Sequence, residues 1–486
     1  MISKTMNRFV LYTFVLFLVS NVISAQEPVA FVDHQSPPNG APAYVPSPPP
    51  EAGQHLKQTL DKLENGIHPP RPFLIWALGS SYTHMLGDGT AWKEEMTKRF
   101  PKAPPIEYKK MVGNSCPWQY LRGWARHLVF ADQPDLILTY TIGDPQHLDL
   151  LLTELRQHTT ADIIVPSIHW RMRDVANWGK SEDAADQKVA ALREICAKHQ
   201  AEFVENRRDW GTYLKANGLP IQALLKDAVH QNGYGAKIIN QNILSHLRRP
   251  PGYPDQAVRE RRVNAEALVA SSQGFRRDGE DLVSSEAGAR LKVVFEGNRI
   301  ELIGVSAADS GLVKVLIDGV PAGEAPCFLA TYIQGDKNNA KPTKTSNPRD
   351  QSPHGITLGE KQVLQDWAIL MTSDQGDFTL TGSVTGEDGQ GNAYKPFRSS
   401  SGQIIMEPDL WRRPERNSKG DRFTFSVRRV TVPEVSFVPQ DGSAPGVFRI
   451  RLANMLPRGK HVVELVTADE KPVRIRAVDL FQPPAN

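Results

Sequence analysis

Residues 135–142 read DLILTYTI and residues 161–166 read ADIIVP. Both runs are almost continuously apolar, which is typical of strands buried on both faces of a parallel sheet. Strand-like runs also occur at 73–78, 107–112 and 201–205. Helix-like stretches lie between or after these runs, at about 90–100, 117–130, 147–157, 182–199 and 234–247. This alternation predicts a doubly wound α/β domain with a five-stranded parallel sheet flanked by helices.

The first 25 residues have the pattern of a secretory signal peptide. Lys4 and Arg8 precede a mostly apolar run over 9–23, and Ser24-Ala25 supplies small residues for cleavage. A single membrane anchor is the alternative, but the apolar run is shorter than the roughly 20 residues that a span needs. We therefore expect a secreted or periplasmic protein without a membrane span once the signal peptide has been removed.

A proline-rich segment separates this signal from the α/β pattern. Residues 26–55 contain many prolines, which predicts an extended tether, and 55–64 has leucines at helical spacing, which predicts a short helix. Together they form a tether region over 26–70, and the α/β domain is expected at 71–250.

The composition excludes some classes of function. Hydrophobic residues make up 40% and charged residues 23%, which is typical of a globular protein. A net charge of +3 and the lack of a long basic run argue against nucleic-acid binding. Only Cys116, Cys196 and Cys327 are present, so no disulfide framework supports the fold. Cys116 and Cys196 could pair within one domain, but buried free thiols are the favoured interpretation.

The pattern changes after a linker at 249–254. Short alternating runs separated by turn residues follow, such as Leu291–Phe295, Leu312–Ile317 and His461–Val466. They predict an all-β sandwich, jelly-roll-like, over 255–486. Within it, 360–371 is expected to contain a helical piece.

Residues that can carry chemistry follow the predicted strands. In an open α/β sheet the ligand site lies beyond the carboxyl ends of the strands. The most specific pattern is Asp227 three residues before His230, just ahead of the last predicted helix of the domain. The carboxylate can orient the imidazole, and the imidazole can deprotonate a serine. Ser81, two residues after the first strand-like run and its glycine, is the serine that this arrangement requires.

At this point the stretch 73–248 resembles the SGNH (GDSL-type) hydrolase family. Gly79-Ser80-Ser81 matches the family's Gly-Asp-Ser block, Gly113 its second glycine, and Asp227-x-x-His230 its last block. The resemblance implies Ser81 as nucleophile, His230 as general base and Asp227 as the orienting carboxylate. It also implies that the backbone N–H groups of Ser81 and Gly113 bind the oxyanion.

Two positions depart from the family pattern. Ser80 replaces the Asp of the first block, which supports the turn in the family and is not the base. Pro145 stands where the family has its oxyanion-hole Asn, and proline has no N–H to donate. We expect Gln146, Asn114 or His147 to supply that donor from a shifted loop.

Other interpretations of these residues remain open. Ser81 could be a plain helix N-cap, and Ser80 could be the nucleophile instead. The residues predicted to contact substrate are His169, Trp170, Arg171 and Trp118, and a structural role is the alternative for the His169 cluster. Asp144, His147 and His169 match no metal-binding spacing, so we expect neither a metal nor an organic cofactor.

These patterns predict a secreted serine esterase that removes an acyl group, with acetyl favoured, from an oligosaccharide or polysaccharide. A methyl-ester or lipid-ester hydrolase of the same fold is the first alternative, and a catalytically degenerate glycan-binding protein is the second. The β region could bind glycan or pack as a structural domain. The aromatic residues that could stack on sugars there are Trp367, Trp411, Tyr332 and Tyr394.

Overall fold

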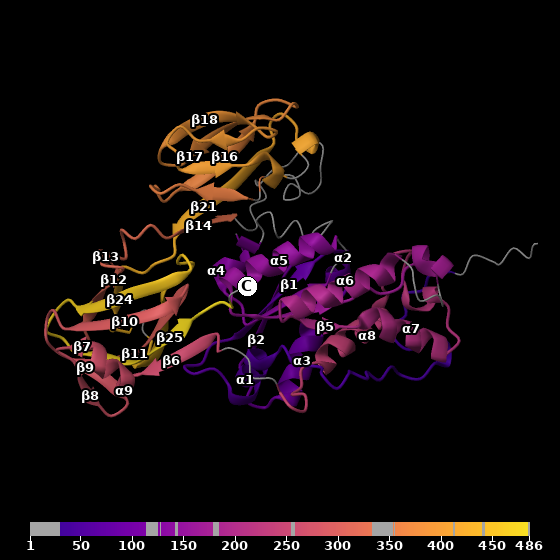
Figure 1. The fold of residues 1–486 in the computed structure, drawn as a ribbon, viewed down its shortest axis with the longest axis horizontal. Helices are drawn as coiled ribbons and strands as arrows, with labels where there is room; N and C mark the ends of the chain where they lie inside the picture. Colours follow the sequence, from indigo (N-terminus) through magenta and orange to yellow (C-terminus); the bar gives the residue numbers. More distant parts are fainter. Residues whose placement is uncertain are drawn as a thin grey trace, which may run out of the picture.

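The computed structural model has an α/β domain and two β units (Figure 1). The structure describes residues 30–112, 125–126, 128–140, 144–177, 184–253, 258–332, 353, 355–411, 414–439 and 443–484. The predicted signal peptide therefore lies outside the described residues. None of the helices within these ranges is long and apolar enough to cross a membrane.

A five-stranded parallel sheet forms the centre of the α/β domain, which confirms the predicted fold of this part of the chain. The strand order is β2-β1-β3-β4-β5. From β1, one connection leads to β2 on one side and the following strands are added on the other side, starting with β3, so the carboxyl ends of β1 and β3 form the switch point at which open α/β sheets bind ligands. The strands are β1 (Phe73–Gly79), β2 (Ile106–Val112), β3 (Leu136–Tyr140), β4 (Asp162–Pro166) and β5 (Glu202–Val204).

Helices cover both faces of this sheet, because alternate residues of each strand point to opposite faces. Ile75 and Leu138 belong to the hydrophobic cluster with α1, α3, α7 and α8, whereas Trp76 and Ile137 belong to the cluster with α4, α5 and α6. The helices are α1 (Lys57–Asn65), α2 (Ser81–His84), α3 (Thr90–Arg99), α4 (Phe130–Asp132), α5 (Pro145–His158), α6 (Ala184–Lys198), α7 (Asn206–Ala216) and α8 (Gly233–Ser245).

The segment before α1 differs from the tether that the sequence predicts. Residues 30–56, which we call the N-terminal strap, pack against the α/β domain. Pro38, Ala52 and Leu56 are buried. The backbone N–H of Gly53 donates to Oε1 of buried Glu202 at 2.7 Å. The prolines keep the strap extended, and its hydrogen bonds to the domain hold it in place.

The first β unit is a sandwich of two antiparallel sheets around one hydrophobic core. One sheet contains β13-β12-β24-β10-β7, with β22 beside β12, and the other contains β23-β11-β25-β9-β8, with β6 beside β25. The bounds are β6 (Glu260–Asn264), β7 (Ser272–Gln273), β8 (Arg276–Asp278), β9 (Asp281–Ser284), β10 (Arg290–Gly297), β11 (Arg299–Ser306), β12 (Leu312–Ile317), β13 (Val320–Pro321), β22 (Glu434–Ser436), β23 (Gly446–Ala453), β24 (Gly459–Thr467) and β25 (Val473–Phe481), with α9 (Ala265–Leu268) after β6.

A second β unit is inserted between β13 and β22 and has its own core, so the β-rich part does not form the single sandwich that we expected. Figure 1 shows it in orange, apart from the sandwich. Its sheets are β14-β21-β16-β17-β18 and β15-β20-β19. The bounds are β14 (Phe328–Tyr332), β15 (Ile356–Leu358), β16 (Asp366–Met371), β17 (Asp377–Gly382), β18 (Gly386–Asn392), β19 (Phe397–Arg398), β20 (Ile404–Met406) and β21 (Arg422–Arg429).

The helical piece expected at 360–371 is wrong, because strand β16 occupies its second half. Residues 366–371 alternate between buried and more exposed positions, and Trp367, Ile369 and Met371 face the core. A period of two fits a strand with one buried face. Trp367 and Trp411 both lie in this core, at 0% and 3% exposure, and neither can present a ring to a glycan.

The sandwich packs against the end of the parallel sheet where the strands begin. Ligands bind to such sheets at the opposite end, beyond the carboxyl ends of the strands. Arg451 on β23 donates to the carbonyl of Ala131 at 2.9 Å. Asn454 donates to the carbonyl of Phe130 at 3.0 Å. Both acceptors lie in α4, just before β3 begins. The sandwich therefore supports the α/β domain at the amino ends of its strands.

Candidate active site

The turn after β1 places Ser81 at the start of α2. A Cβ on Gly79 would lie 1.8 Å from Thr83 Oγ1 and 2.4 Å from the carbonyl oxygen of Tyr140, so only glycine fits between β1 and β3. Ser80 is the N-cap of α2, and its hydroxyl accepts a hydrogen bond from the backbone N–H of Tyr82 at 3.3 Å. Ser80 thus stabilises the turn, and Ser81 follows it as the first residue of the helix.

A second turn, over residues 225–231, carries Asp227 and His230. The backbone N–H groups of Val229 and His230 both donate to Asp227 Oδ1 at 2.8 Å. The N–H of Lys226 donates to the carbonyl of His230 at 3.0 Å, which closes the turn. These bonds hold the carboxylate and the imidazole on the same side of the turn.

The two turns meet beyond the carboxyl ends of the parallel strands. His230 Nε2 lies 2.8 Å from Ser81 Oγ. His230 Nδ1 lies 2.8 Å and 3.0 Å from the two carboxylate oxygens of Asp227. Since a carboxylate only accepts, Nδ1 carries the proton, and Nε2 accepts the hydroxyl proton of Ser81. This is the serine, base and orienting acid arrangement of a triad.

Electrostatics keeps Asp227 ionised. Partial burial raises the pKa of this carboxyl, but the backbone N–H groups of His230 and Val229 and the imidazole of His230 lower it more. The net pKa of Asp227 is below its ordinary value, so the carboxylate is charged at neutral pH. The side chains of His230 and Asp227 are 26% and 48% exposed, which leaves the site open to solvent on one side.

His169 lies beneath the His230 turn and is completely buried. Its Nε2 lies 2.9 Å from the carbonyl oxygen of Val229, and its Nδ1 lies 2.6 Å from the hydroxyl of Tyr140. A carbonyl only accepts, so Nε2 carries the proton and Nδ1 accepts from Tyr140. Burial lowers the pKa of His169 to about 3, which keeps the ring neutral. His169 therefore supports the turn that carries the base.

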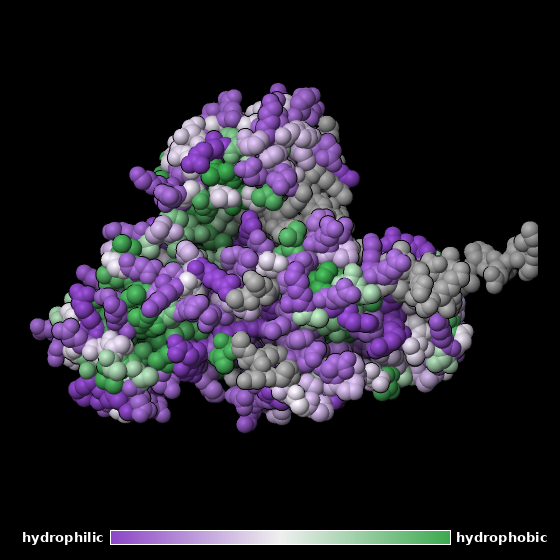
Figure 2. Space-filling model, in the orientation of Figure 1, coloured by the Kyte–Doolittle hydropathy of each residue, from purple (hydrophilic) through white to green (hydrophobic). Residues whose placement is uncertain are grey.

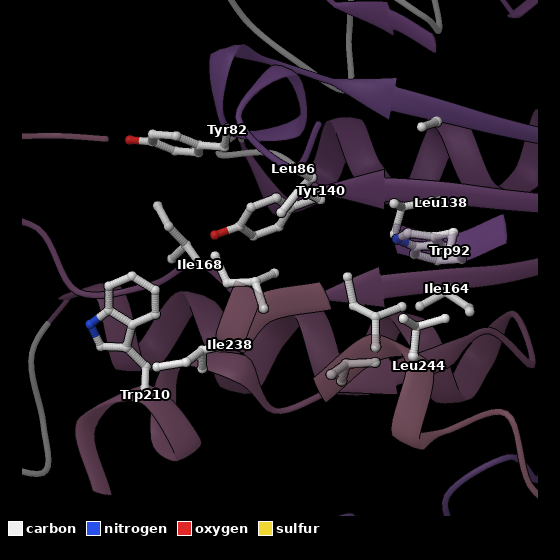
Figure 3. Packing of buried hydrophobic residues seen from close by; sticks show 14 of the residues in the cluster. Tyr82, Leu86, Trp92, Leu138, Tyr140, Ile164, Ile168, Trp210, Ile238 and Leu244 are labelled. Atoms are coloured by element: carbon white, nitrogen blue, oxygen red, sulfur yellow. The ribbon is translucent and has the colours of Figure 1, made fainter. Parts of the chain in front are cut away.

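Aromatic rings surround His169 and separate it from solvent. The ring of Tyr82 packs edge-on against His169 at 4.9 Å and against His230 at 5.8 Å between centroids. The ring of Trp210, from α7, lies 5.1 Å from that of His169 between centroids. Figure 3 shows Tyr82, Tyr140 and Trp210 as members of the hydrophobic core cluster of the α/β domain. The site thus rests on a packed aromatic layer.

The predicted substrate-contacting wall of His169, Trp170 and Arg171 is wrong, because all three side chains are buried below the surface. Trp170 donates to the carbonyl of Arg207, whose guanidinium stacks on its ring. Arg171 forms two bonds of 3.1 Å with the carboxylate of Asp174. These bonds hold the segment after β4 in place. Trp118, the fourth residue predicted to contact substrate, lies outside the described residues.

The N–H groups predicted to bind the oxyanion differ in the hydrogen bonds that they form. The backbone N–H of Ser81 donates to no acceptor in the described parts of the chain and lies in the first turn of α2. The N–H of Gln146 donates to Asp144 Oδ1 at 3.0 Å, and that of His147 donates to the carbonyl of Asp144 at 3.1 Å. Both amides therefore serve the start of α5 and do not supply the missing donor. Gly113 and Asn114 lie outside the described residues.

Metal-binding side chains and cysteines do not form a centre in the part of the chain that the structure covers. No group of three or more His, Cys, Asp or Glu side chains gathers there at metal-binding distances. Cys196 and Cys327 are buried free thiols. Cys116 lies outside the described residues, and so does its possible pairing.

Sequence reasoning missed two residues that join the halves of the site. Gln231, buried next to His230, donates its side-chain amide to the carbonyl of Tyr82 at 2.8 Å. Tyr140 positions His169, as described above. Gln231 follows a recognisable Asp-x-x-His pattern, but nothing local indicates that its partner lies in the turn after β1.

Comparisons with known proteins give distant likenesses only. No protein-family model matches the chain, and no curated protein matches its sequence. A two-domain esterase active on acetylated mannans is 12% identical over 89% of this chain and 95% of its own, with a TM-score of 0.32. An acetylxylan esterase from Geobacillus stearothermophilus is 17% identical over 37% of this chain and 96% of its own, with a TM-score of 0.30. We therefore assign the site from its geometry.

Proposed function

We propose that this protein is a serine esterase. The observation that carries the proposal is the continuous chain of contacts from Ser81 Oγ through the His230 imidazole to the Asp227 carboxylate, with 2.8 Å at each step. A nucleophile and base within hydrogen-bond reach, with the base oriented by a third group, are what nucleophilic catalysis requires. The chain of contacts lies at the carboxyl edge of the sheet, next to the switch point.

In the first half of the reaction, Ser81 Oγ attacks the ester carbonyl while His230 Nε2 takes the hydroxyl proton. Asp227 stabilises the imidazolium that forms and keeps Nε2 directed at the serine. The carbonyl oxygen becomes an oxyanion, and the backbone N–H of Ser81 is placed to donate to it. His230 then returns the proton to the alcohol oxygen, which leaves as the C–O bond breaks and the acyl-enzyme remains.

In the second half, a water molecule takes the place of the alcohol. His230 accepts its proton, the hydroxide oxygen attacks the acyl carbonyl, and the acid leaves as Ser81 recovers its proton. The partial exposure of His230 and Asp227 gives water access to this step. The two halves consume one water and yield one acid and one alcohol.

We propose an acylated carbohydrate as the substrate class, with acetyl as the favoured acyl group. The support is the signal-peptide pattern at the N-terminus, which indicates export, and the β units that accompany the α/β domain. The open site fits an ester displayed on a large molecule better than a buried small one. Acetylated mannan and xylan, on which the similar proteins above act, are the first substrates to test.

The experiment compares two neighbouring serines. Ser81→Ala should lower acetate release from these polymers and from an aryl acetate by about 10⁴-fold or more, because the nucleophile is lost. Ser80→Ala, the matched control, should lose far less activity than Ser81→Ala, because the nucleophile remains and only the cap of α2 is weakened. Undiminished acetate release by Ser81→Ala would refute the proposal, and methanol among the products would indicate a methyl-ester hydrolase.

A glycan-binding protein without activity is the second candidate. The observation that favours it is the start of α5, where Pro145 has no N–H and Asp144 holds the amides of Gln146 and His147. An incomplete oxyanion hole can cost two to three orders of magnitude in rate, on the order of 3 kcal/mol. A fluorophosphonate probe separates the candidates: labelling that Ser81→Ala abolishes supports the esterase, and no labelling of the intact protein supports the binder.

A further inference from the structure

The N-terminal strap contacts the chain directly after the proposed catalytic base. Three consecutive strap residues accept hydrogen bonds from three consecutive residues that follow His230 by two to four positions. Asn232 Nδ2 donates to the carbonyl of Val32 at 2.9 Å, and Tyr234 N donates to the carbonyl of His34 at 2.6 Å. Between them, Gly233 N donates to Asp33 Oδ1 at 2.8 Å. The strap thus lies against the junction of the His230 turn and α8.

These contacts give hydrogen-bond partners to N–H groups at the start of α8 that the helix itself does not satisfy. The first N–H groups of a helix have no partner within the helix. Asn232, the N-cap of α8, uses its own Oδ1 for Gly235 N at 2.9 Å. The N–H groups of Gly233 and Tyr234 are left for the strap, and a carboxylate such as that of Asp33 is favoured at a helix N-terminus.

Other contacts hold the strap in register. The backbone N–H of Tyr44 donates to the hydroxyl of Tyr234 at 2.7 Å, and the hydroxyl of Tyr44 donates to Asn242 on α8. The hydroxyl of Tyr213 donates to the carbonyl of Pro42 at 2.9 Å. These bonds to α7 and α8 therefore anchor the part of the strap that follows Asp33.

We propose that the N-terminal strap positions the catalytic base, with Asp33 as the positioning residue. The inference rests on the proposed esterase function. Several contacts hold the His230 turn: His169 binds the carbonyl of Val229, Met172 N donates to the carbonyl of Ala228, Gln231 binds the carbonyl of Tyr82, and Asp33 binds the N–H of Gly233. Loss of the Asp33 contact lets the end of the turn next to α8 move, and His230 with it. Asp33 touches no reacting atom in this arrangement.

The chain offers a matched control for this role. Asp88 is also an exposed carboxylate, and its Oδ1 accepts a hydrogen bond at 3.0 Å from Thr90 N, at the start of α3. Helix α3 carries none of the proposed catalytic residues. Asp88→Ala therefore removes a similar cap from a helix start that does not follow the base.

The test measures hydrolysis of an aryl acetate by Asp33→Ala, Asp33→Asn and Asp88→Ala in the full-length mature chain. Asp33→Ala should lower kcat roughly tenfold with little change in KM, because small displacements of a catalytic group are costly. Asp33→Asn should restore most of this loss, because its amide oxygen still accepts from Gly233 N. Asp88→Ala should keep the wild-type kcat. Equal kcat values for Asp33→Ala and Asp88→Ala would overturn the proposal.

Deuterium exchange gives a readout that does not depend on activity. In Asp33→Ala, the peptide covering 226–236 should exchange faster than in the wild type and in Asp88→Ala, while a peptide from α3 should not. Unchanged exchange over 226–236 would overturn the role of the strap even if the chain hydrolysed no ester. A wild-type chain that neither labels with fluorophosphonate nor releases acetate would instead refute the esterase function, whatever the exchange result.

Discussion

His169 shows how one buried side chain can set the position of an active-site turn. Both ring nitrogens form hydrogen bonds, one with the Val229 carbonyl and the other with the Tyr140 hydroxyl. A neutral ring suits this role, because a protonated Nδ1 could no longer accept from Tyr140. From the sequence, a histidine after a buried strand predicts a ligand or substrate contact as readily as a support. The burial that distinguishes these roles comes from α7 and the His230 turn, which are distant in sequence.

The buried neutral state of His169 should make the protein acid-sensitive. The pKa of His169 is about 3 in the folded protein, whereas an unperturbed histidine titrates near pH 6.5. Between these values the unfolded chain binds the proton and the folded chain does not. The free energy of unfolding therefore falls as the pH falls, by up to ~1.4 kcal/mol per pH unit.

His169→Gln removes this titration while keeping a side chain that can donate and accept. Its free energy of unfolding should fall less steeply with acid than that of the wild type between about pH 4 and pH 6. Urea unfolding of both proteins across this range measures the difference. Parallel curves would show that His169 is not held neutral.

At the scale of elements, the sequence predicted the parallel strands well and the helices less well. Buried parallel strands are local apolar runs, so β1 to β5 could be recognised without their neighbours. Helix α7 was missed, since its buried residues face the strap and α8 in a pattern with many polar residues between. The sequence predicts a helix where β16 lies, because a short apolar run fits the period of a helix as well as that of a strand.

Tyr394, in the turn after β18, is the remaining exposed candidate for glycan stacking among the aromatics described in the second β unit. Its side chain is half-exposed, and its ring lies against Gly376, which has a positive φ of 92° and leaves space for it. Asn392 accepts from the backbone N–H of Tyr394 at 3.0 Å and donates to Asp377. The ring is therefore presented on a fixed turn.

If the second β unit binds glycan, Tyr394→Ala should weaken retention on an acetylated polysaccharide about fivefold, or ~1 kcal/mol, while hydrolysis of an aryl acetate stays unchanged. Leu370→Ala is the matched control, because Leu370 is an exposed apolar residue on β16 of the same unit. Affinity electrophoresis in a Ser81→Ala background separates binding from turnover. If both variants migrate equally in the polysaccharide gel, Tyr394 does not contribute to glycan binding.

At the scale of the whole molecule, the sandwich and the α/β domain share buried charges. Lys62 on α1 contacts both Asp135, just before β3, and Glu260 on β6, each at 2.8 Å. Burial raises the pKa of Asp135, but Lys62 and Arg71 lower it well below its ordinary value. Arg259, just before β6, forms an ion pair with buried Asp162, with 3.2 Å between the guanidinium nitrogen and the carboxylate oxygen. Without the sandwich, part of this network would lose its partners.

The second β unit differs, because the two segments that join it to the sandwich run side by side. Phe328 pairs with Arg429, and Val430 N donates to the carbonyl of Cys327 at 3.3 Å. Figure 2 shows mainly hydrophilic residues on the visible face of the molecule, with apolar residues in small separate patches. Because domains whose two ends lie close together tolerate insertion into another chain, a short link can close the gap that removal of this unit leaves.

Two deletions should therefore have opposite effects. A chain that ends at residue 253 should give a lower yield of folded, soluble protein, because charged groups of the buried ionic network lose their partners. A chain without residues 329–428, closed by a short Gly-Ser turn, should keep its melting temperature and aryl acetate hydrolysis. Calorimetry and the aryl acetate assay measure both. A stable, active chain ending at 253 would show that the sandwich is dispensable for the site.

The amino-acid sequence alone is enough to predict the five parallel strands, the β-rich second half, and an Asp-x-x-His pattern that pairs with a serine after the first strand. These features are short and periodic, so local sequence carries them. The folded structure adds three features: Ser81 contacts His230, 149 residues away in sequence, His169 supports the turn that carries His230, and the N-terminal strap packs beside that turn. Such contacts depend on long-range packing and burial, which no local pattern records.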